Sequence, residues 1–307
     1  MKILITGGGG FLGSWTVALL RLNHEIIVLS RPESKLNRIA SLDDVQFVRE
    51  PIHLWPEVIN SHKPDVCIFF HWDGVLGADR NSLLQMENVS EFEKLLDGIN
   101  VPTRIIGVGS QAELGTCSGE ITESQEDGAL TTYGTAKILA RKALINNPKF
   151  RDRSTWARIF STYGNLDNES WFIPSAINSL SQNRNFPMTQ GEQLWSYLHA
   201  FDVARAFQLI VEVKPISNIV NIGNPFPVRL SEVANQIMKA VDSKAVIEIG
   251  KVPYRQDEVM FMKPICETLV SIGWKPLIEL DFGLAVIAEE AQGKRFDLSQ
   301  FINENLT

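Results

Sequence analysis

Residues 1–14 read MKILITGGGGFLGS, a short apolar run followed by four glycines and a second apolar segment. The apolar run from Lys2 to Thr6 predicts a β-strand, and the amphipathic segment from Phe11 to Leu22 predicts a helix. A strand, a glycine-rich turn and a helix in this order form the first half of a βαβ unit. The sequence therefore predicts an α/β protein whose first strand belongs to a parallel sheet.

The spacing of the glycines in this turn also indicates that the turn binds a ligand. Gly7 permits a tight turn, Gly10 lets the backbone approach a pyrophosphate, and Gly13 allows the helix to pack closely on the strand. The backbone N–H groups of Phe11 and Leu12 open the helix and are free to bind an anion. The turn is predicted to bind a dinucleotide, and a glycine-rich turn without a ligand is the alternative.

Further short runs rich in Val, Ile or Phe follow in the first half of the chain. They are apolar throughout, as expected for strands that helices cover on both faces. The predicted strands are Glu25–Leu29, Val45–Val48, Val66–Phe70, Arg104–Val108 and Thr155–Phe160. This alternation predicts a Rossmann-type, doubly wound parallel sheet.

The regular alternation weakens after residue 160, where we place a domain boundary. We expect residues 1–165 to form the dinucleotide-binding domain, with part of 195–230 completing its sheet. Residues 166–307 should form most of a smaller α+β domain for substrate. Its predicted helices are Trp171–Leu180, Asp202–Val213 and one that Ser231 caps.

Composition and charge limit the possible partners. A net charge of -7 and a pI near 5.4 argue against binding to nucleic acid or to anionic membranes. The sequence shows no secretory signal and no apolar run of about 18 residues, so we expect a cytoplasmic protein without a membrane span. Cys67, Cys117 and Cys266 lack ligand spacing, so we interpret them as reduced and expect no metal site.

The end of the second strand bears on which dinucleotide binds. An acidic residue there would accept a hydrogen bond from the adenosine ribose, but Ser30 and Arg31 occupy the position. A hydroxyl and a guanidinium can bind a 2′-phosphate, and Lys35 and Arg38 lie close enough in sequence to assist. NADP is therefore favoured. In the alternative interpretation Arg31 is a solvated surface charge and the cofactor is NAD.

Three side chains indicate catalysis. Tyr133 and Lys137 are four residues apart and share one helix face, while Ser110 follows the fifth strand at the carboxyl edge of the sheet, where such folds bind ligands. A phenol is a poor base at neutral pH, but a nearby ammonium and a bound nicotinamide would lower its pKa. Ser110 could then bind the substrate oxygen while hydride moves between substrate and nicotinamide.

These features together resemble the extended short-chain dehydrogenase/reductase superfamily over nearly the whole chain. Members mostly act on nucleotide-linked sugars and commonly form homodimers, and the resemblance implies that Asn88 contacts the cofactor. The matching segments are Gly7–Gly13, Asn88, Gly109–Gly115, Tyr133–Lys137, Arg158–Gly164, Gly191–Ala206, Pro253–Glu258 and Gly273–Pro276.

The resemblance also sorts the possible reactions. The family's 4,6-dehydratases carry an Asp-Glu pair where this chain has Gln111 and Ala112, and its epimerising reductases need a nearby cysteine that is missing here. A keto-sugar reductase and an epimerase remain, and the NADP preference favours the reductase. The C-terminal pattern is similar to 4-ketoreductases of the abequose and paratose synthase kind, which implies that Arg255 meets the substrate pyrophosphate.

Two departures from the family pattern leave roles open. Trp195 stands where many relatives have an arginine, so it either stacks on a substrate ring or packs in the core. His71 and Trp72 replace two small residues beside the cofactor, and His71 is either a proton relay or a structural histidine. A third class of function is a regulator that binds NADP without turnover, although such proteins usually lose the tyrosine or the lysine.

Overall fold

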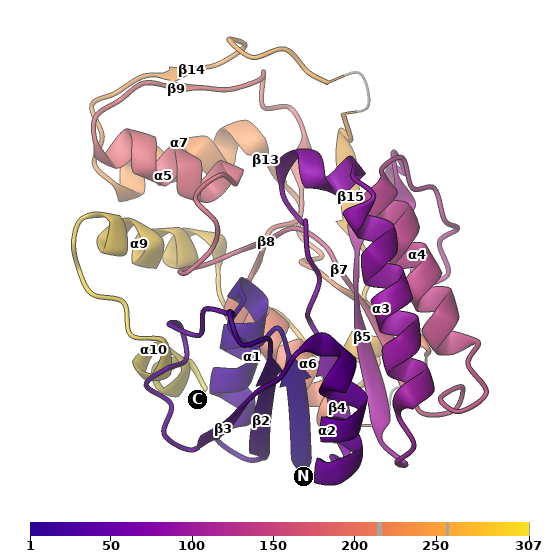
Figure 1. Cartoon of the computed structure of the whole chain (residues 1–307). Coiled ribbons are helices and arrows are strands. Elements are labelled where there is room, and N and C mark those ends of the chain that lie inside the picture. Colours follow the sequence, from indigo (N-terminus) through magenta and orange to yellow (C-terminus); the bar gives the residue numbers. More distant parts are fainter. Residues whose placement is uncertain (214–216, 256–257, 307) are drawn as a thin grey trace.

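The computed structural model describes residues 1–213, 217–255 and 258–306 (Figure 1). Seven parallel strands form the main sheet in the order β12-β7-β5-β4-β1-β2-β3, which confirms the predicted Rossmann-type fold. The strands are β1 (Lys2–Thr6), β2 (Glu25–Ser30), β3 (Val45–Arg49), β4 (Val66–Phe69), β5 (Arg104–Ser110), β7 (Ser154–Ile159) and β12 (Ile219–Ile222). The order reverses between β1 and β4, and open α/β sheets bind ligands in the crevice at such a point.

The central strands form because both of their faces are covered. Ile3, Leu4 and Ile5 of β1 have no exposed surface. Successive side chains point to opposite faces, so Ile3 and Ile5 join one hydrophobic core and Leu4 joins another. This two-sided burial explains why the strand is apolar at every position.

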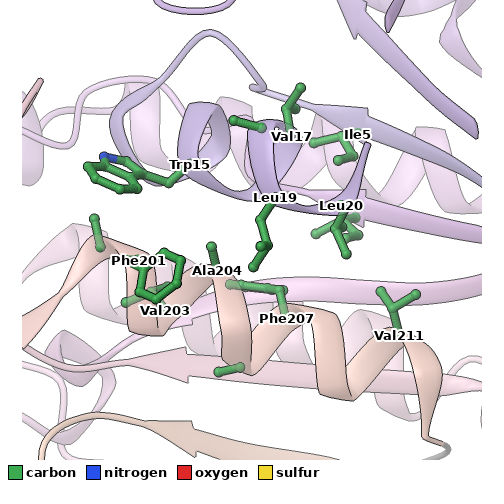
Figure 2. Packing of buried hydrophobic residues seen from close by; sticks show 14 of the residues in the cluster. Ile5, Trp15, Val17, Leu19, Leu20, Phe201, Val203, Ala204, Phe207 and Val211 are labelled. Atoms are coloured by element: carbon green, nitrogen blue, oxygen red, sulfur yellow. The ribbon is translucent and has the colours of Figure 1, made fainter. Parts of the chain in front are cut away.

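Helices α1 (Phe11–Leu20) and α6 (Ala200–Glu212) cover one face and pack against each other. Figure 2 shows Leu19 of α1 facing Phe207 of α6 across this contact. Helices α2 (Trp55–His62), α3 (Leu84–Gly98) and α4 (Thr132–Ile145) cover the opposite face. Because α6 and β12 follow residue 165 in the chain, the later half of the sequence helps to build the main sheet and its layers.

A separate hydrophobic core lies among α5 (Phe172–Ser181), α7 (Leu230–Ala240) and α9 (Leu280–Ala291). Figure 1 shows these helices beyond the carboxyl ends of β1 and β5. Helices α8 (Glu267–Ser271) and α10 (Leu298–Asn305) instead pack with α1 and α6 in the core of the main sheet. The short strands form three small sheets, which are β13-β10-β15-β6 (Val228–Arg229, Leu194–Trp195, Phe261–Pro264, Gly119–Ile121), β11-β8 (Leu198–His199, Thr162–Tyr163) and β14-β9 (Ile247–Glu248, Phe186–Pro187).

The predicted cap of the helix near residue 231 is wrong. Helix α7 begins at Leu230, and Arg229 precedes it without a side-chain cap. The N–H of Leu230 donates to the carbonyl of Gln193, and the N–H of Ser231 donates to that of Gly191. Backbone carbonyls from a distant segment therefore satisfy the first donors of this helix, so Ser231 has no capping role.

Within the described residues, no helix has both the length and the apolar character required to cross a lipid bilayer. The same residues contain no cluster of three or more His, Cys, Asp or Glu side chains arranged to bind a metal ion. Cys67, Cys117 and Cys266 are all free thiols.

Candidate active site

The glycine-rich turn forms a cradle that side chains would fill. Gly7 has φ +69°, and a Cβ added to it would lie 2.7 Å from the backbone nitrogen of His71. A Cβ on Gly13 would lie 2.3 Å from the carbonyl oxygen of Gly7, so helix and strand touch at this point. A Cβ on Gly10 would meet only that same oxygen, at 3.1 Å, and so Gly10 faces open space. No side chain caps α1, so its first N–H groups are available to an anion.

A pocket of about 360 Å³ extends from this turn over the end of β2. The buried Ser30 hydroxyl faces no hydrogen-bond partner within the described chain, as expected for a group that contacts a ligand. The pocket is lined by Gly7, Gly9, Gly10, Ser30, Arg31, Glu33, Ser34, Lys35, Leu36, Trp55 and His71. Its position and lining fit the adenosine half of a dinucleotide.

Arg38 does not assist at this pocket in the way that the sequence suggested. Its guanidinium donates to the carbonyls of Gly9 and Leu166, at 3.0 and 2.9 Å. These bonds tie the glycine-rich turn to the segment after β8. Lys35 does line the pocket, and Arg31 lines it as well but is already bound by two carboxylates.

Ser110, Tyr133 and Lys137 come together at the carboxyl end of β5. Ser110 is the last residue of β5, and its hydroxyl accepts a hydrogen bond from the N–H of Ala112 at 3.2 Å. The buried Tyr133 lies in the first turn of α4, and the Ser110 side chain is near enough to lower the pKa of its phenol. The Lys137 ammonium donates to the carbonyl of Val108 on β5 at 2.9 Å.

Opposing effects set the pKa of the Tyr133 phenol. Burial raises it, and this effect is the largest. The Ser110 hydroxyl and the charge of Arg80 lower it, because both stabilise the phenolate. The Arg80 guanidinium lies over the tyrosine ring, 4.3 Å from its centroid. No sequence motif pointed to Arg80, since a short 3-10 helix, Gly77–Asn81, supplies it from 53 positions before Tyr133 in the chain.

Lys137 is almost completely buried, and burial lowers its pKa to about 7. Its ammonium lies 3.7 Å from the centroid of the Trp72 ring and 5.8 Å from that of the Tyr133 ring. Trp72, one of the two departures from the family pattern, therefore covers the lysine that the sequence placed beside the cofactor. In this arrangement Arg80 is closer to the phenol ring than the lysine is.

A buried charge cluster supports the serine end of the site. Glu113 is fully buried, and its Oε1 accepts the backbone N–H of Ser110 and the indole N–H of Trp156, both at 2.9 Å. Its Oε2 accepts a hydrogen bond from Arg141 at 3.1 Å and lies 3.6 Å from the Nε of Arg158. No local sequence pattern marks this cluster, because its charged members Glu113 and Arg158 lie 45 positions apart in the chain.

Asn88 lies beneath the crevice and contacts backbone. Its amide oxygen accepts the N–H of Asp73 at 3.2 Å, and its amide nitrogen donates to the carbonyl of Asp73 at 3.0 Å. Gln85 donates to the carbonyls of Gly74 and Asp79 and accepts the indole N–H of Trp72. Asn88 and Gln85 thus fix the loop after β4.

The structure gives few contacts for the residues predicted to bind substrate. Trp195 on β10 is half-buried and donates its indole N–H to the carbonyl of Val259 at 3.1 Å. Arg255 is exposed, next to residues 256–257, which lie outside the described chain. Gln111 is half-buried near the Ser161 hydroxyl. None of the contacts among the described residues joins Trp195 or Arg255 to Tyr133.

Comparison with known proteins places this geometry in a family. The family model described as NAD dependent epimerase/dehydratase matches residues 3–223. The CDP-abequose synthase of Salmonella typhimurium is 27% identical over 133 residues, which cover 41% of this chain and only 44% of that protein. The CDP-paratose 2-epimerase of Salmonella typhi is 27% identical over 92% of this chain and 97% of that protein.

Among solved structures, the dTDP-glucose 4,6-dehydratase DesIV of Streptomyces venezuelae, with NAD and TYD bound, has a similar fold. The TM-score is 0.81 at 20% identity, over 95% of this chain and 97% of that one. The fold and the family match together define an NAD(P)-dependent enzyme of the oxidoreductase type. The chain belongs to the NAD-dependent epimerase/dehydratase family, which confirms the resemblance to extended short-chain dehydrogenase/reductases.

Proposed function

We propose that the protein catalyses the NADPH-dependent reduction of a keto group on a nucleotide-linked deoxy sugar, as a 4-ketoreductase. The observation that carries the proposal is the meeting of Ser110, Tyr133 and Lys137 at the end of β5. Only β4 separates this strand from β1 and its glycine-rich turn. Catalytic groups and a dinucleotide cradle thus face one crevice.

Cofactor binding is assigned to the turn after β1 and to the end of β2. The open face of the turn and the uncapped α1 suit a pyrophosphate, and the unpartnered Ser30 hydroxyl suits the ribose end. NADPH, once bound, supplies the hydride. The residues assigned are Gly7, Gly10, Phe11, Leu12, Gly13, Ser30 and Arg31. Asn88 is assigned a positioning role, since it holds the Asp73 backbone.

Tyr133 is assigned the role of general acid in the reduction. When the carbonyl carbon accepts hydride, its oxygen gains negative charge and takes the phenol proton, and the ketone becomes an alcohol. Ser110 donates a hydrogen bond to the same oxygen as the charge develops. The phenolate left behind is stabilised by the cations of Lys137 and Arg80, and it recovers a proton from solvent.

The substrate class rests on the family and on the resemblance drawn from sequence. Gln111 and Ala112 cannot transfer protons, which disfavours dehydration. One relative is a CDP-abequose synthase, and the C-terminal pattern of this chain is similar to ketoreductases of that kind. Arg255 is proposed to bind the substrate pyrophosphate, and Trp195 to stack on the base or sugar.

An epimerase is the second candidate, and one observation favours it. Asp73 and Glu33 hold Arg31, and carboxylates at the ribose end suit NAD better than NADP. An epimerase returns the hydride to its substrate and regenerates its cofactor. The CDP-paratose 2-epimerase relative supports this candidate.

The experiment that tests the proposal is incubation with NADPH and a panel of CDP-, dTDP-, GDP- and UDP-linked 4-keto-6-deoxy sugars. A reductase consumes NADPH in proportion to the alcohol formed, seen as loss of nicotinamide absorbance. Interconversion of sugar isomers without net loss of absorbance would identify the epimerase. If no member of the panel is turned over while NADPH binds, the reductase proposal fails.

A further inference from the structure

Arg31 and Asp73 form an ion pair across the cofactor crevice. Arg31 follows β2 and Asp73 follows β4, and β1 lies between these strands. The guanidinium donates two parallel hydrogen bonds to the carboxylate, at 2.7 and 3.0 Å. A bidentate pair of this kind is strong and directional. The pair therefore spans the end of the strand that leads into the glycine-rich turn.

The side chains in contact with Arg31 do not favour a further anion, although Lys35 also lines the pocket. Glu33 lies 3.2 Å from the Nε of Arg31, so two carboxylates surround one guanidinium. His71 lies 3.9 Å from Asp73, but burial lowers the pKa of His71 to about 4, and the ring is neutral at physiological pH. These four side chains carry a net charge of about −1 at neutral pH. A 2′-phosphate entering here would compete with Asp73 for the guanidinium.

Asp73 cannot move away as a whole, because its backbone is fixed. Asn88 binds both its N–H and its carbonyl, and Gln85 donates to the same carbonyl at 3.3 Å. Only rotation of the side chain can release Arg31. The carboxylate consequently stays near the pocket whichever ligand binds.

We propose that Asp73 is a determinant of dinucleotide choice: its carboxylate holds Arg31 in the free protein, and a 2′-phosphate binds by displacing it. This inference rests on the proposed cofactor site and refines it. Asp73 lowers the affinity for the 2′-phosphate without affecting the rest of the adenosine. Neutralising Asp73 therefore strengthens binding of 2′-phosphorylated ligands and leaves other adenosine ligands unchanged.

The test uses two probes that differ only in the 2′-phosphate, adenosine 2′,5′-bisphosphate and adenosine 5′-monophosphate, with affinities measured by calorimetry on the full chain. Asp73→Asn should bind the bisphosphate about tenfold more tightly than wild type, and the monophosphate within about twofold. Asp73→Ser, which also removes the carboxylate, should show the same gain. Glu33→Gln is the matched control, because the Glu33 side chain is 67% exposed and its removal should give a gain of less than about threefold.

The role of Arg31 is tested by the double variant Arg31→Gln/Asp73→Asn. If the proposal holds, the gain from Asp73→Asn disappears without the guanidinium. Unchanged affinity for the bisphosphate in both Asp73 variants, or an equal gain for the two probes, would overturn it. Neither measurement requires a sugar substrate, so the inference and the proposed reductase activity can fail independently.

Discussion

Replacement of Glu113 by Gln tests the buried cluster behind the active-site serine. The carboxylate accepts hydrogen bonds from Ser110, Trp156 and Arg141, and all of its surface is buried. Glutamine has nearly the same shape but carries no charge, and its NH2 group must face a donor. Arg158, also fully buried, loses its nearest carboxylate. Removing one partner of a buried ion pair costs about 3–5 kcal/mol.

We therefore expect Glu113→Gln to lower the free energy of unfolding by about 3–5 kcal/mol and, in a chain of 307 residues, Tm by about 5–8 °C. Urea unfolding followed by circular dichroism measures the first quantity, and a thermal melt measures the second. Glu120→Gln is the matched control, because Glu120 is 63% exposed and its ion pair with Lys263 should contribute less than about 1 kcal/mol. A loss of less than about 1 kcal/mol at Glu113 would refute the reasoning, since the cluster would then be solvated or flexible.

Two further variants test the charges around the phenol. In a Tyr254→Phe background, Arg80→Gln should raise the pKa of Tyr133 by about one unit, because the positive charge that stabilises the phenolate is removed. The magnitude is half of the Coulomb attraction between unit charges about 5 Å apart at an effective dielectric of about 20, and the factor of one half allows for screening by solvent. Tyrosinate absorbance measures the pKa of Tyr133, because burial raises the pKa of Tyr163 and of Tyr197 out of the titration range. An unchanged pKa of Tyr133 in Arg80→Gln would exclude the contact. Lys137→Met tests the buried ammonium, whose pKa burial lowers to about 7 in the folded protein. Above this pH the unfolded chain binds one proton more than the folded chain, so the free energy of unfolding rises by about 1.4 kcal/mol per pH unit. Urea unfolding at about pH 7.5 and 9 should show that rise in wild type and not in Lys137→Met, and equal slopes would contradict it.

The fold could be predicted because its signals are local. Strands such as β1 and β4 are buried on both faces, so continuous apolar runs mark them directly. The glycine spacing identified the turn, since only glycine fits where a Cβ would meet backbone at Gly7 and Gly13. Two-residue strands such as β9 and β14 carry no such signal, because their pairing depends on a partner about 60 positions away.

The sequence predicted the site only where two functional residues lie at a fixed spacing on one helix. Tyr133 and Lys137 share a helix face, which the sequence shows directly. Asp73 on Arg31, and Arg80 over Tyr133, are contacts between segments far apart in the chain, which no periodicity encodes. The cofactor interpretation depends most on these contacts, because Arg31 must exchange the Asp73 carboxylate for a 2′-phosphate before it can bind NADPH.

The central claim is that Tyr133 supplies the proton for carbonyl reduction while the cofactor site is formed by other residues. The most direct measurement compares wild type with Tyr133→Phe, using single-turnover oxidation of bound NADPH by the keto sugar found active in the panel, together with the NADPH dissociation constant. In Tyr133→Phe we expect a rate lower by about 10²–10⁴-fold, with the dissociation constant changed by less than about threefold. A Tyr133→Phe rate within about tenfold of wild type would contradict it.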